Sequence, residues 1–133
     1  MNNLQVGYAK ADITPVSGIG LAGYYMDRPC DGVLDNLEAI AVAIKAGDTM
    51  VLMLTLDNLG IHDVQTNAVM RRTVAERTGV KESCITISCT HTHTAPFVNL
   101  NADDEKIVQY TKTVIGKTAD GAAYAIEDLQ NAK

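Results

Sequence analysis

The sequence is poor in aromatic residues, with no Trp, one Phe and five Tyr among 133 residues. It therefore lacks the set of aromatic side chains on which proteins stack the bases of single-stranded nucleic acids. It also lacks any run of Lys and Arg, and its net charge is −5. Because nucleic acids and anionic membrane surfaces both select basic patches, we expect neither as a partner.

Long apolar segments are absent too. No stretch approaches the ~20 apolar residues of a membrane span, so no transmembrane segment is expected. The first residues lack the basic and apolar regions of a signal peptide. The three cysteines, Cys30, Cys84 and Cys89, are odd in number and form no Cys-x-x-Cys pair. This usage fits a reducing compartment better than a disulfide framework, and we expect a cytoplasmic protein.

The remaining composition is typical of one soluble domain. Hydrophobic residues make up 47% and charged residues 20% of the chain, and we treat residues 1–133 as a single domain. Apolar runs bounded by turn residues predict four strands: Val6–Ile13, Leu37–Lys45, Thr49–Asp57 and Cys84–Cys89. Apolar spacing of three and four predicts two helices, His62–Thr78 and Asp103–Leu129.

The order of these elements predicts an α/β fold. The helix 62–78 joins strands 49–57 and 84–89, which should therefore run parallel with a right-handed crossover. Ala46-Gly47-Asp48 supplies a hairpin turn between strands 37–45 and 49–57. The run 50–56 is apolar on both faces, as in a central strand covered on both sides. We expect a mixed sheet of about four strands, with a parallel βαβ unit and two amphipathic helices.

Local signals mark the helix ends and one long loop. Asp63 is placed to cap the first helix and Gly79 to end it, while Ile61, Val64, Ala68 and Ala75 are predicted to form its apolar face. Residues 14–36 are rich in Gly and Pro and form no periodic pattern. Long loops inside compact domains are usually functional. Because its centre, residues 21–25, is apolar, we expect this loop to fold back over another segment.

The residues best suited to metal binding or catalysis lie in the octapeptide 89–96, Cys-Thr-His-Thr-His-Thr-Ala-Pro. On an extended segment His91 and His93 would share one face. The carboxyl ends of the two parallel strands, at Asp57-Asn58 and at Thr90–Thr94, should open onto the same crevice, where ligands bind in open α/β sheets. The histidine pair and the acidic strand end are therefore expected in one region.

These residues alone allow three interpretations. The two imidazoles could bind a metal such as zinc. One histidine could act as a general base, oriented by a carboxylate such as Asp57. Both rings could also simply hydrogen-bond to backbone and threonine hydroxyls at a strand end. The third histidine, His62, begins a helix and is expected to pack on a loop, and Asp12 is expected to form an Asx-turn before Thr14-Pro15.

Three segments together resemble the N-terminal region of the neutral/alkaline (non-lysosomal) ceramidase family. They are Val6–Pro15, Leu21–Tyr24 and Thr90–Pro96, and their order and approximate spacing also match. The resemblance implies a zinc amidohydrolase that cleaves the N-acyl bond of a lipid or small-molecule amide. It implies that His91 is a zinc ligand, that His93 lies beside the metal, contacting substrate and assisting proton transfer, and that the loop 20–25 forms part of the pocket wall. We therefore expect His93 to be catalytic together with Asp57, and expect four residues to contact substrate: Gly23, Tyr24, Thr92 and Thr94.

The chain also departs from that family. The other zinc ligands of the family, a second His, a Glu and a Tyr, come from farther downstream, and no residue of this chain maps onto them. Many relatives carry a His before the Asp of the Gly-Val-x-Asp segment, where this chain has Leu34. We therefore expect the chain to be incomplete as a catalyst alone. The alternative is a non-catalytic α/β binding or oligomerisation domain, and in either case we expect a homo-oligomer formed through uncovered apolar surface.

Overall fold

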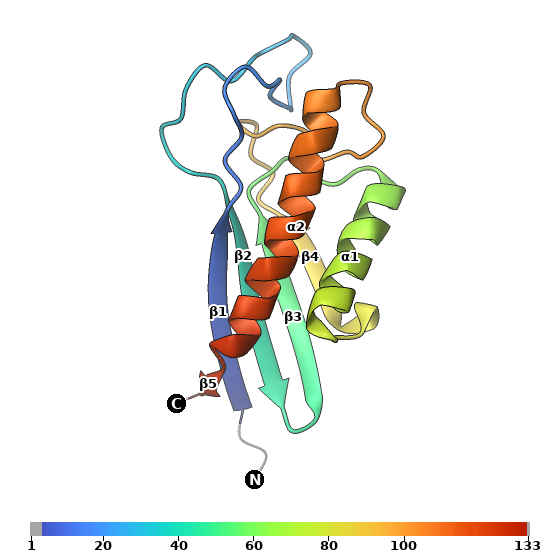
Figure 1. Ribbon diagram of the computed structural model, residues 1–133. Coiled ribbons are helices and arrows are strands. Elements are labelled where there is room, and N and C mark those ends of the chain that lie inside the picture. Colours follow the sequence, from blue (N-terminus) through green and yellow to red (C-terminus); the bar gives the residue numbers. More distant parts are fainter. Residues whose placement is uncertain (1–3, 133) are drawn as a thin grey trace.

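A single mixed β-sheet carries both long helices on the same face (Figure 1). The structure, a computed structural model, describes residues 4–132. Its strands are β1 (Leu4–Asp12), β2 (Glu38–Ala46), β3 (Thr49–Leu56), β4 (Ile85–Cys89) and β5 (Gln130–Asn131), in the sheet order β4-β3-β2-β1-β5. Its helices are α1 (Val64–Thr78), the short 3₁₀ helix η1 (Glu82–Cys84) and α2 (Glu105–Glu127).

The expected α/β class is confirmed. β3 and β4 pair in parallel across α1, whereas the other paired strands are antiparallel. The sheet has five strands rather than about four, because the last residues after α2 return to pair with the edge of β1. Within residues 4–132, no helix is both long and apolar enough to cross a lipid bilayer.

Small residues let α2 approach the sheet closely. Ala39, Ala41 and Ala43 line the buried face of β2, beneath the helix. At Gly7 a Cβ atom would lie 1.9 Å from the carbonyl oxygen of Ala125, so only glycine allows the β1 backbone and α2 to meet there. One face of α2 is buried, with the spacing of three and four that predicted the helix: Ile107, Thr111, Val114, Thr118, Ala122 and Ala125.

The ends of α1 are as predicted, but its buried face is so only in part: of the predicted residues, Ile61 and Ala75 are partly buried against the core. Asp63 accepts a hydrogen bond from the Thr66 amide at 2.7 Å, and Gly79 ends the helix with φ at 74°. Val64, however, is 83% exposed and Ala68 is also exposed. The face that packs on the sheet carries Thr66, Met70 and Val74. The prediction missed Thr66 because a threonine is buried here with its hydroxyl hydrogen-bonded, accepting from the Leu100 amide at 2.9 Å.

The far face of the sheet is also unlike the prediction. The central strand β3 is apolar on both faces, yet only the face toward the helices is covered within residues 4–132. Leu52, Leu54 and Leu56 point to the helices and are buried, whereas Met53 points away and is 51% exposed. The expectation that residues 50–56 are covered on both sides is therefore wrong for the described chain.

Candidate functional site

Two loops lie together beyond the carboxyl ends of β3 and β4 (Figure 1). We call residues 13–37, 57–60 and 90–96 the loop end of the sheet. The Ala22 amide donates a hydrogen bond to the Ala95 carbonyl at 2.9 Å, and Leu21 forms a β-bridge with Pro96. The apolar centre of the long loop therefore does fold back, and it packs on the histidine-bearing segment.

The two ends of the long loop, at Ile13 and Leu37, lie together; we call this point the neck of the loop, and hydrogen bonds from the backbone and from α2 hold it in place. The Ile13 amide donates to the Leu37 carbonyl at 2.8 Å, which joins the two ends of the loop. The buried hydroxyl of Tyr110, on α2, donates to the Ile13 carbonyl at 2.8 Å. Burial, aided by the charges of Asp12 and Asp57, raises the pKa of Tyr110, so this phenol remains a hydrogen-bond donor across the physiological pH range.

His91 occupies an unusual backbone conformation. Its φ is 62°, in the left-handed region that residues other than glycine seldom adopt. Its Nδ1 lies 2.7 Å from the carbonyl oxygen of Leu59. A carbonyl only accepts, so Nδ1 carries the proton and the lone pair of the neutral ring resides on Nε2. This is the orienting contact that metal-binding histidines commonly make through their second nitrogen.

His93 lies against His91 and against the long loop. The ring centroids of the two histidines are 5.2 Å apart with an interplanar angle of 79°, and the Tyr24 ring meets His93 edge-on at 5.5 Å. β4 ends at Cys89, so the strand alternation that suggested a shared face does not extend to these residues. The two rings are nevertheless adjacent, because the chain turns at His91.

Gly23 is the point of closest approach between the loop and the pair. Its φ is 96°, and a Cβ atom placed there would lie 2.4 Å from Nδ1 of His93. Glycine is therefore required twice, for its backbone conformation and for the space beside the ring. The predicted substrate contact at Gly23 stays a prediction, while its contact with His93 is a feature of the fold.

Arg28 is a member of this region that the sequence analysis missed. Its guanidinium carbon lies 4.2 Å from the centre of the Tyr24 ring, a cation–π arrangement. The same guanidinium donates a hydrogen bond to the backbone carbonyl of His93. Arg28 is the only basic residue between positions 13 and 37, and a single cation in a loop that also carries Asp27, Asp31 and Asp35 was the available signal.

The two threonines beside the histidines bind each other. The hydroxyl oxygens of Thr92 and Thr94 are 2.8 Å apart, and the Thr94 amide donates to Thr92 Oγ1 at 3.3 Å. Thr94 is exposed, and with Leu21 it borders a cavity of about 580 Å³ whose other walls come from residues 14–15 and 30–37. Thr94 therefore connects the histidine-bearing segment to a hollow large enough for a small organic ligand.

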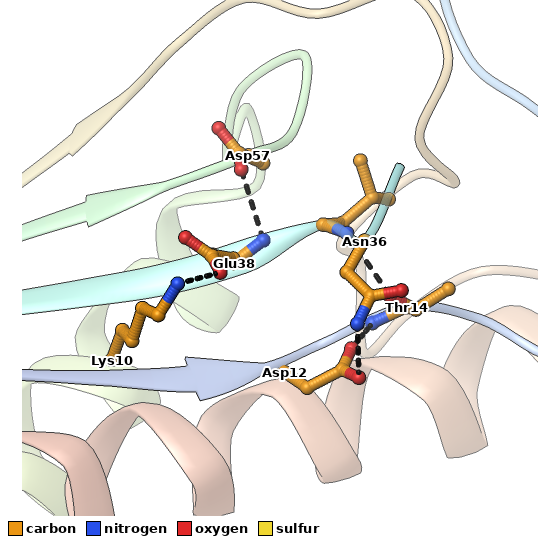
Figure 2. A network of polar contacts seen from close by, with 7 residues as sticks. Lys10, Asp12, Thr14, Asn36, Glu38 and Asp57 are labelled. Carbon is orange, nitrogen blue, oxygen red and sulfur yellow. Dashed lines mark hydrogen bonds and ion pairs between the residues drawn. The ribbon is translucent and has the colours of Figure 1, made fainter. Parts of the chain in front are cut away.

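Asp57 contacts backbone rather than an imidazole (Figure 2). Its Oδ2 accepts from the Glu38 amide at 2.9 Å, and its own amide donates to the Glu38 carbonyl at the same distance. Nδ1 of His91 is bonded to Leu59 instead. Asp57 thus extends the pairing of β2 and β3 by two hydrogen bonds at the end of the ladder. A catalytic role for it remains a prediction.

Asp12, in the same network, has the structural role expected of it (Figure 2). Its Oδ1 accepts from the Thr14 amide at 2.8 Å, which is the predicted Asx-turn, and Oδ2 accepts from the Asn36 side chain at 3.0 Å. Hydrogen bonds from Thr14, from its side chain and then from its amide, hold the pKa of Asp12 below its ordinary value. These contacts connect the two ends of the long loop.

Asn58 was placed at this end of the sheet by the sequence, but no role was expected for it. It is fully buried, and within the described residues neither its amide nitrogen nor its amide oxygen has a hydrogen-bond partner. Burying an unpaired amide costs stability, so packing alone does not favour asparagine here. Asn58 directly precedes Leu59, whose carbonyl orients His91. A polar residue immediately after a buried strand was the signal for it.

The residues fit a zinc ion only in part. Nε2 of His91 is the type of donor that zinc prefers, and the neighbouring ring of His93 is a second imidazole. Catalytic zinc sites have three protein ligands. Among residues 4–132, however, no group of three or more His, Cys, Asp or Glu side chains is arranged to hold a metal. The loop end of the sheet therefore offers at most part of a zinc shell.

Comparison with solved structures shows that known proteins share this fold. The structure is similar to neutral ceramidase from Pseudomonas aeruginosa, with a TM-score of 0.79 and 21% sequence identity over 98% of this chain and 22% of that chain. It is equally similar to a structure described as ceramidase complexed with C2, with a TM-score of 0.78, 21% identity and the same coverage. No protein-family model matches the sequence, and no curated protein was matched.

The fold resemblance expected from the sequence is therefore confirmed, over a part of the larger proteins. This chain spans about one fifth of the length of the ceramidase chains it matches. At this identity, the similarity shows a shared fold and no more.

Proposed function

We propose that this chain forms the histidine-bearing N-terminal part of a zinc-dependent amide hydrolase of the ceramidase type. The fold similarity to ceramidases supports the lineage. The observation that carries the chemistry is the state of His91, whose backbone is strained and whose Nδ1 is bonded to a carbonyl, which leaves the lone pair on Nε2 of a ring that lies 5.2 Å from the ring of the neighbouring histidine. Strained backbone conformations persist where the surrounding structure enforces them, and they concentrate at functional sites.

The proposal gives each residue a separate task. His91 would hold the zinc ion through Nε2. His93, held between His91 and Tyr24, would contact the substrate and exchange a proton with the amide. When bound, zinc polarises a carbonyl group and activates water for attack on it. Arg28 would position His93 through its carbonyl, and Thr92, Thr94 and Tyr24 would line the approach.

The substrate class follows from the lineage and the cavity. A lipid amide or a smaller N-acyl compound would lie across the histidines, with part of it in the hollow bordered by Leu21 and Thr94. The apolar loop around Leu21 suits an acyl group better than a charged one. Because only two imidazoles lie together at the loop end of the sheet in the described residues, we expect weak zinc binding and no efficient turnover until further ligands complete the shell.

Zinc affinity tests this proposal directly. Competition with a chromophoric chelator should show one zinc ion bound per chain, and His91→Ala should weaken binding at least tenfold. The matched control is His62→Ala, which removes an exposed histidine outside the pair and should leave the affinity unchanged. Equal affinities for the wild type and His91→Ala, or an equal loss in His62→Ala, would contradict the assignment.

The tautomer of His91 provides an independent measurement. Nitrogen NMR of the zinc-free protein above the titration range of histidine should find the proton of His91 on Nδ1, as its contact with Leu59 requires. Addition of zinc should then shift Nε2 of His91 and leave the signals of His62 in place. A proton on Nε2 of His91 in the neutral ring would remove the basis for metal binding there.

A further inference from the structure

Arg28 carries a positive charge that no carboxylate neutralises within residues 4–132. Neither ion pair of this part of the chain includes it. The acids of the same loop, Asp27, Asp31 and Asp35, have exposed side chains and form no ion pair with it. Guanidinium groups held in a fixed position are well suited to bind carboxylates, because their planar N–H groups match the carboxylate oxygens.

Two contacts fix the Arg28 guanidinium and leave part of it free. Its Cζ lies 4.2 Å from the centre of the Tyr24 ring, and its Nη2 donates a hydrogen bond to the His93 carbonyl. The other terminal nitrogen, Nη1, is neither buried nor hydrogen-bonded within the described residues. The N–H groups of Nη1 are therefore available to a ligand.

Stability alone does not favour an arginine at this position. Nε of Arg28 is buried and has no hydrogen-bond partner in the described chain, and a charged group with a buried unpaired donor costs free energy. The stack on Tyr24 offsets little of this cost, because Tyr24 is 57% exposed and water weakens a cation–π contact. An uncharged side chain would avoid the cost, so the charge itself needs an explanation.

Arg28 adjoins both parts of the candidate site. It contacts His93, whose ring lies 5.2 Å from that of His91. Its own backbone carbonyl accepts a hydrogen bond from the Leu21 amide at 2.9 Å, and Leu21 borders the cavity of about 580 Å³. One loop thus places an apolar wall and a cation beside the same histidines. This arrangement suits a molecule with an apolar chain and an anionic group near its amide.

Given the hydrolase function proposed above, we propose that Arg28 binds a carboxylate on the amine side of the substrate, which makes the substrate an N-acyl amino acid. In such a compound a single carbon atom separates the amide nitrogen from the carboxylate. The Tyr24 ring contacts both the Arg28 guanidinium and the His93 ring, so these two groups are separated by the width of one aromatic ring. The carboxylate therefore reaches Arg28 while the amide lies at the histidines.

A carboxylate fits this position better than a phosphate. The chain has a net charge of −5, and the three acids of the loop repel a second negative charge on the ligand. Hydrolysis adds one water molecule across the amide C–N bond and releases a fatty acid and a free amino acid. The carboxylate bound by Arg28 stays with the amino acid and takes no part in the bond that breaks.

Two matched amides test this assignment. N-octanoylglycine and N-octanoylethanolamine share the acyl chain and the amide, but the first ends in a carboxylate and the second in a hydroxyl group. NMR titration of the zinc-free protein, followed at the ring signals of His93, should give a dissociation constant about threefold lower or more for N-octanoylglycine. Equal constants, or no saturable binding of N-octanoylglycine, would overturn the proposal.

Substitutions of Arg28 separate binding from support of the loop. Arg28→Gln removes the charge but keeps an N–H donor for the His93 carbonyl, so the preference for N-octanoylglycine should disappear. Arg28→Lys keeps the charge and should keep the preference. If Arg28 only supported the loop, its loss would weaken both amides by the same factor and leave the ratio of the two constants unchanged. A preference that survives in a folded Arg28→Gln protein, as judged by circular dichroism, contradicts the assignment.

The matched control is Arg72→Gln. It removes one positive charge from an exposed position on α1 and should leave the ratio of the two constants as it is in the wild type. An equal loss of preference in Arg72→Gln would mean that the overall charge of the protein, rather than a contact with Arg28, selects the anionic amide. That result would also overturn the proposal.

Octanoate distinguishes the substrate from one of its products, because it has the chain and a carboxylate but no amide. It should bind more weakly than N-octanoylglycine and should respond less to Arg28→Gln. Equal affinity and equal sensitivity would place the fatty acid at Arg28 and contradict the proposal. None of these titrations contains zinc, so a wrong substrate class would leave the zinc affinity expected for His91 intact and is distinct from failure of the proposed function.

Discussion

Packing explains the residue types in the sheet and its two helices, but it does not explain those at the loop end of the sheet. Between β1, β2 and α2, the residue type at each position is explained by the space available: Ala41 and Ala43 are small because the helix lies directly on them, and Gly7 has no room for a Cβ atom. Packing is enough to account for this part of the molecule.

At the loop end, stability does not explain the residues. His91 is left-handed, Asn58 is buried without a partner in the described chain, and Gly23 is left-handed and in contact with an imidazole. The left-handed histidine and the unpaired buried amide each cost free energy that a different residue would avoid, whereas Gly23 is the residue that its backbone and the neighbouring ring require. Sequences depart from locally favourable choices mainly at functional or strained sites, and here the departures gather around one pair of histidines.

The largest expected effect lies in the packed part. Gly7→Ala would place a Cβ atom 1.9 Å from the Ala125 carbonyl oxygen, so either β1 or α2 must move. We expect a loss of about 3 kcal/mol or more in the free energy of unfolding, measured by urea titration. The control is Gly116→Ala, in the exposed face of α2, where no atom lies within 4 Å of the added Cβ. It should gain about 0.5–1 kcal/mol, because alanine favours a helix.

The next largest effect is expected at Gly23, where a substitution should change the position of the His93 ring as well as the stability of the fold. Gly23→Ala would bring a Cβ atom against Nδ1 of His93 in addition to straining the backbone. We expect it to lower the free energy of unfolding by about 1–3 kcal/mol and to displace the His93 ring, seen as shifted ring NMR signals. Gly18→Ala is the matched control, because Gly18 has φ at 81° but no atom near the added Cβ. It should show the backbone strain alone and leave the His93 signals in place.

A smaller effect should reveal the strain at His91. Substitution by glycine removes the ring and relieves the left-handed backbone, whereas substitution by alanine removes the ring and keeps the strain. His91→Gly should therefore be more stable than His91→Ala by about 1–2 kcal/mol, as measured by urea titration. The same pair at His62 should show no such preference for glycine, since His62 is not left-handed. Equal stability of the two His91 variants would mean that its backbone is not strained.

The smallest effect is the pH dependence of the loop neck. The pKa of Asp12 is lowered from 3.8 in the folded state, so its contribution to stability is present above 3.8 and is lost as the pH falls below it. Asp12→Asn should be less stable than the wild type at neutral pH, and the difference should shrink in acid. Asp48→Asn, in the hairpin turn, controls for the loss of one negative charge. Thermal melts at several pH values measure both, and a difference that persists at low pH would contradict the role of the carboxylate.

Much of the fold could be predicted because local patterns decide it. The hairpin turn at Gly47, the cap at Asp63 and the C-terminal glycine Gly79 act within a few residues of their own position. The phase of α1 was missed because its buried residues include Thr66, which periodicity counts as polar although its hydroxyl is paired. β5 was missed because its two residues pair with β1, more than a hundred positions away.

The candidate site was less accessible to sequence reasoning. The histidine pair and the loop that returns to it were predicted, since both leave local signals. The left-handed backbone of His91 and the contact of Arg28 with the His93 carbonyl were not, because they depend on which segments meet in three dimensions. The orienting partner of His91 is likewise a main-chain carbonyl, at Leu59, which no side-chain motif encodes.

The closed neck of the long loop has a consequence for how this protein can vary. Ile13 and Leu37 are bonded to each other, and the bonds of Gly18 and Cys30 tighten the segment a second time, before its exposed tip at residues 31–36. Insertions or exchanges in the tip can therefore reshape the hollow beside Thr94 without disturbing the backbone that carries the histidines. Related chains could thus diverge in ligand preference by replacing half a dozen surface residues.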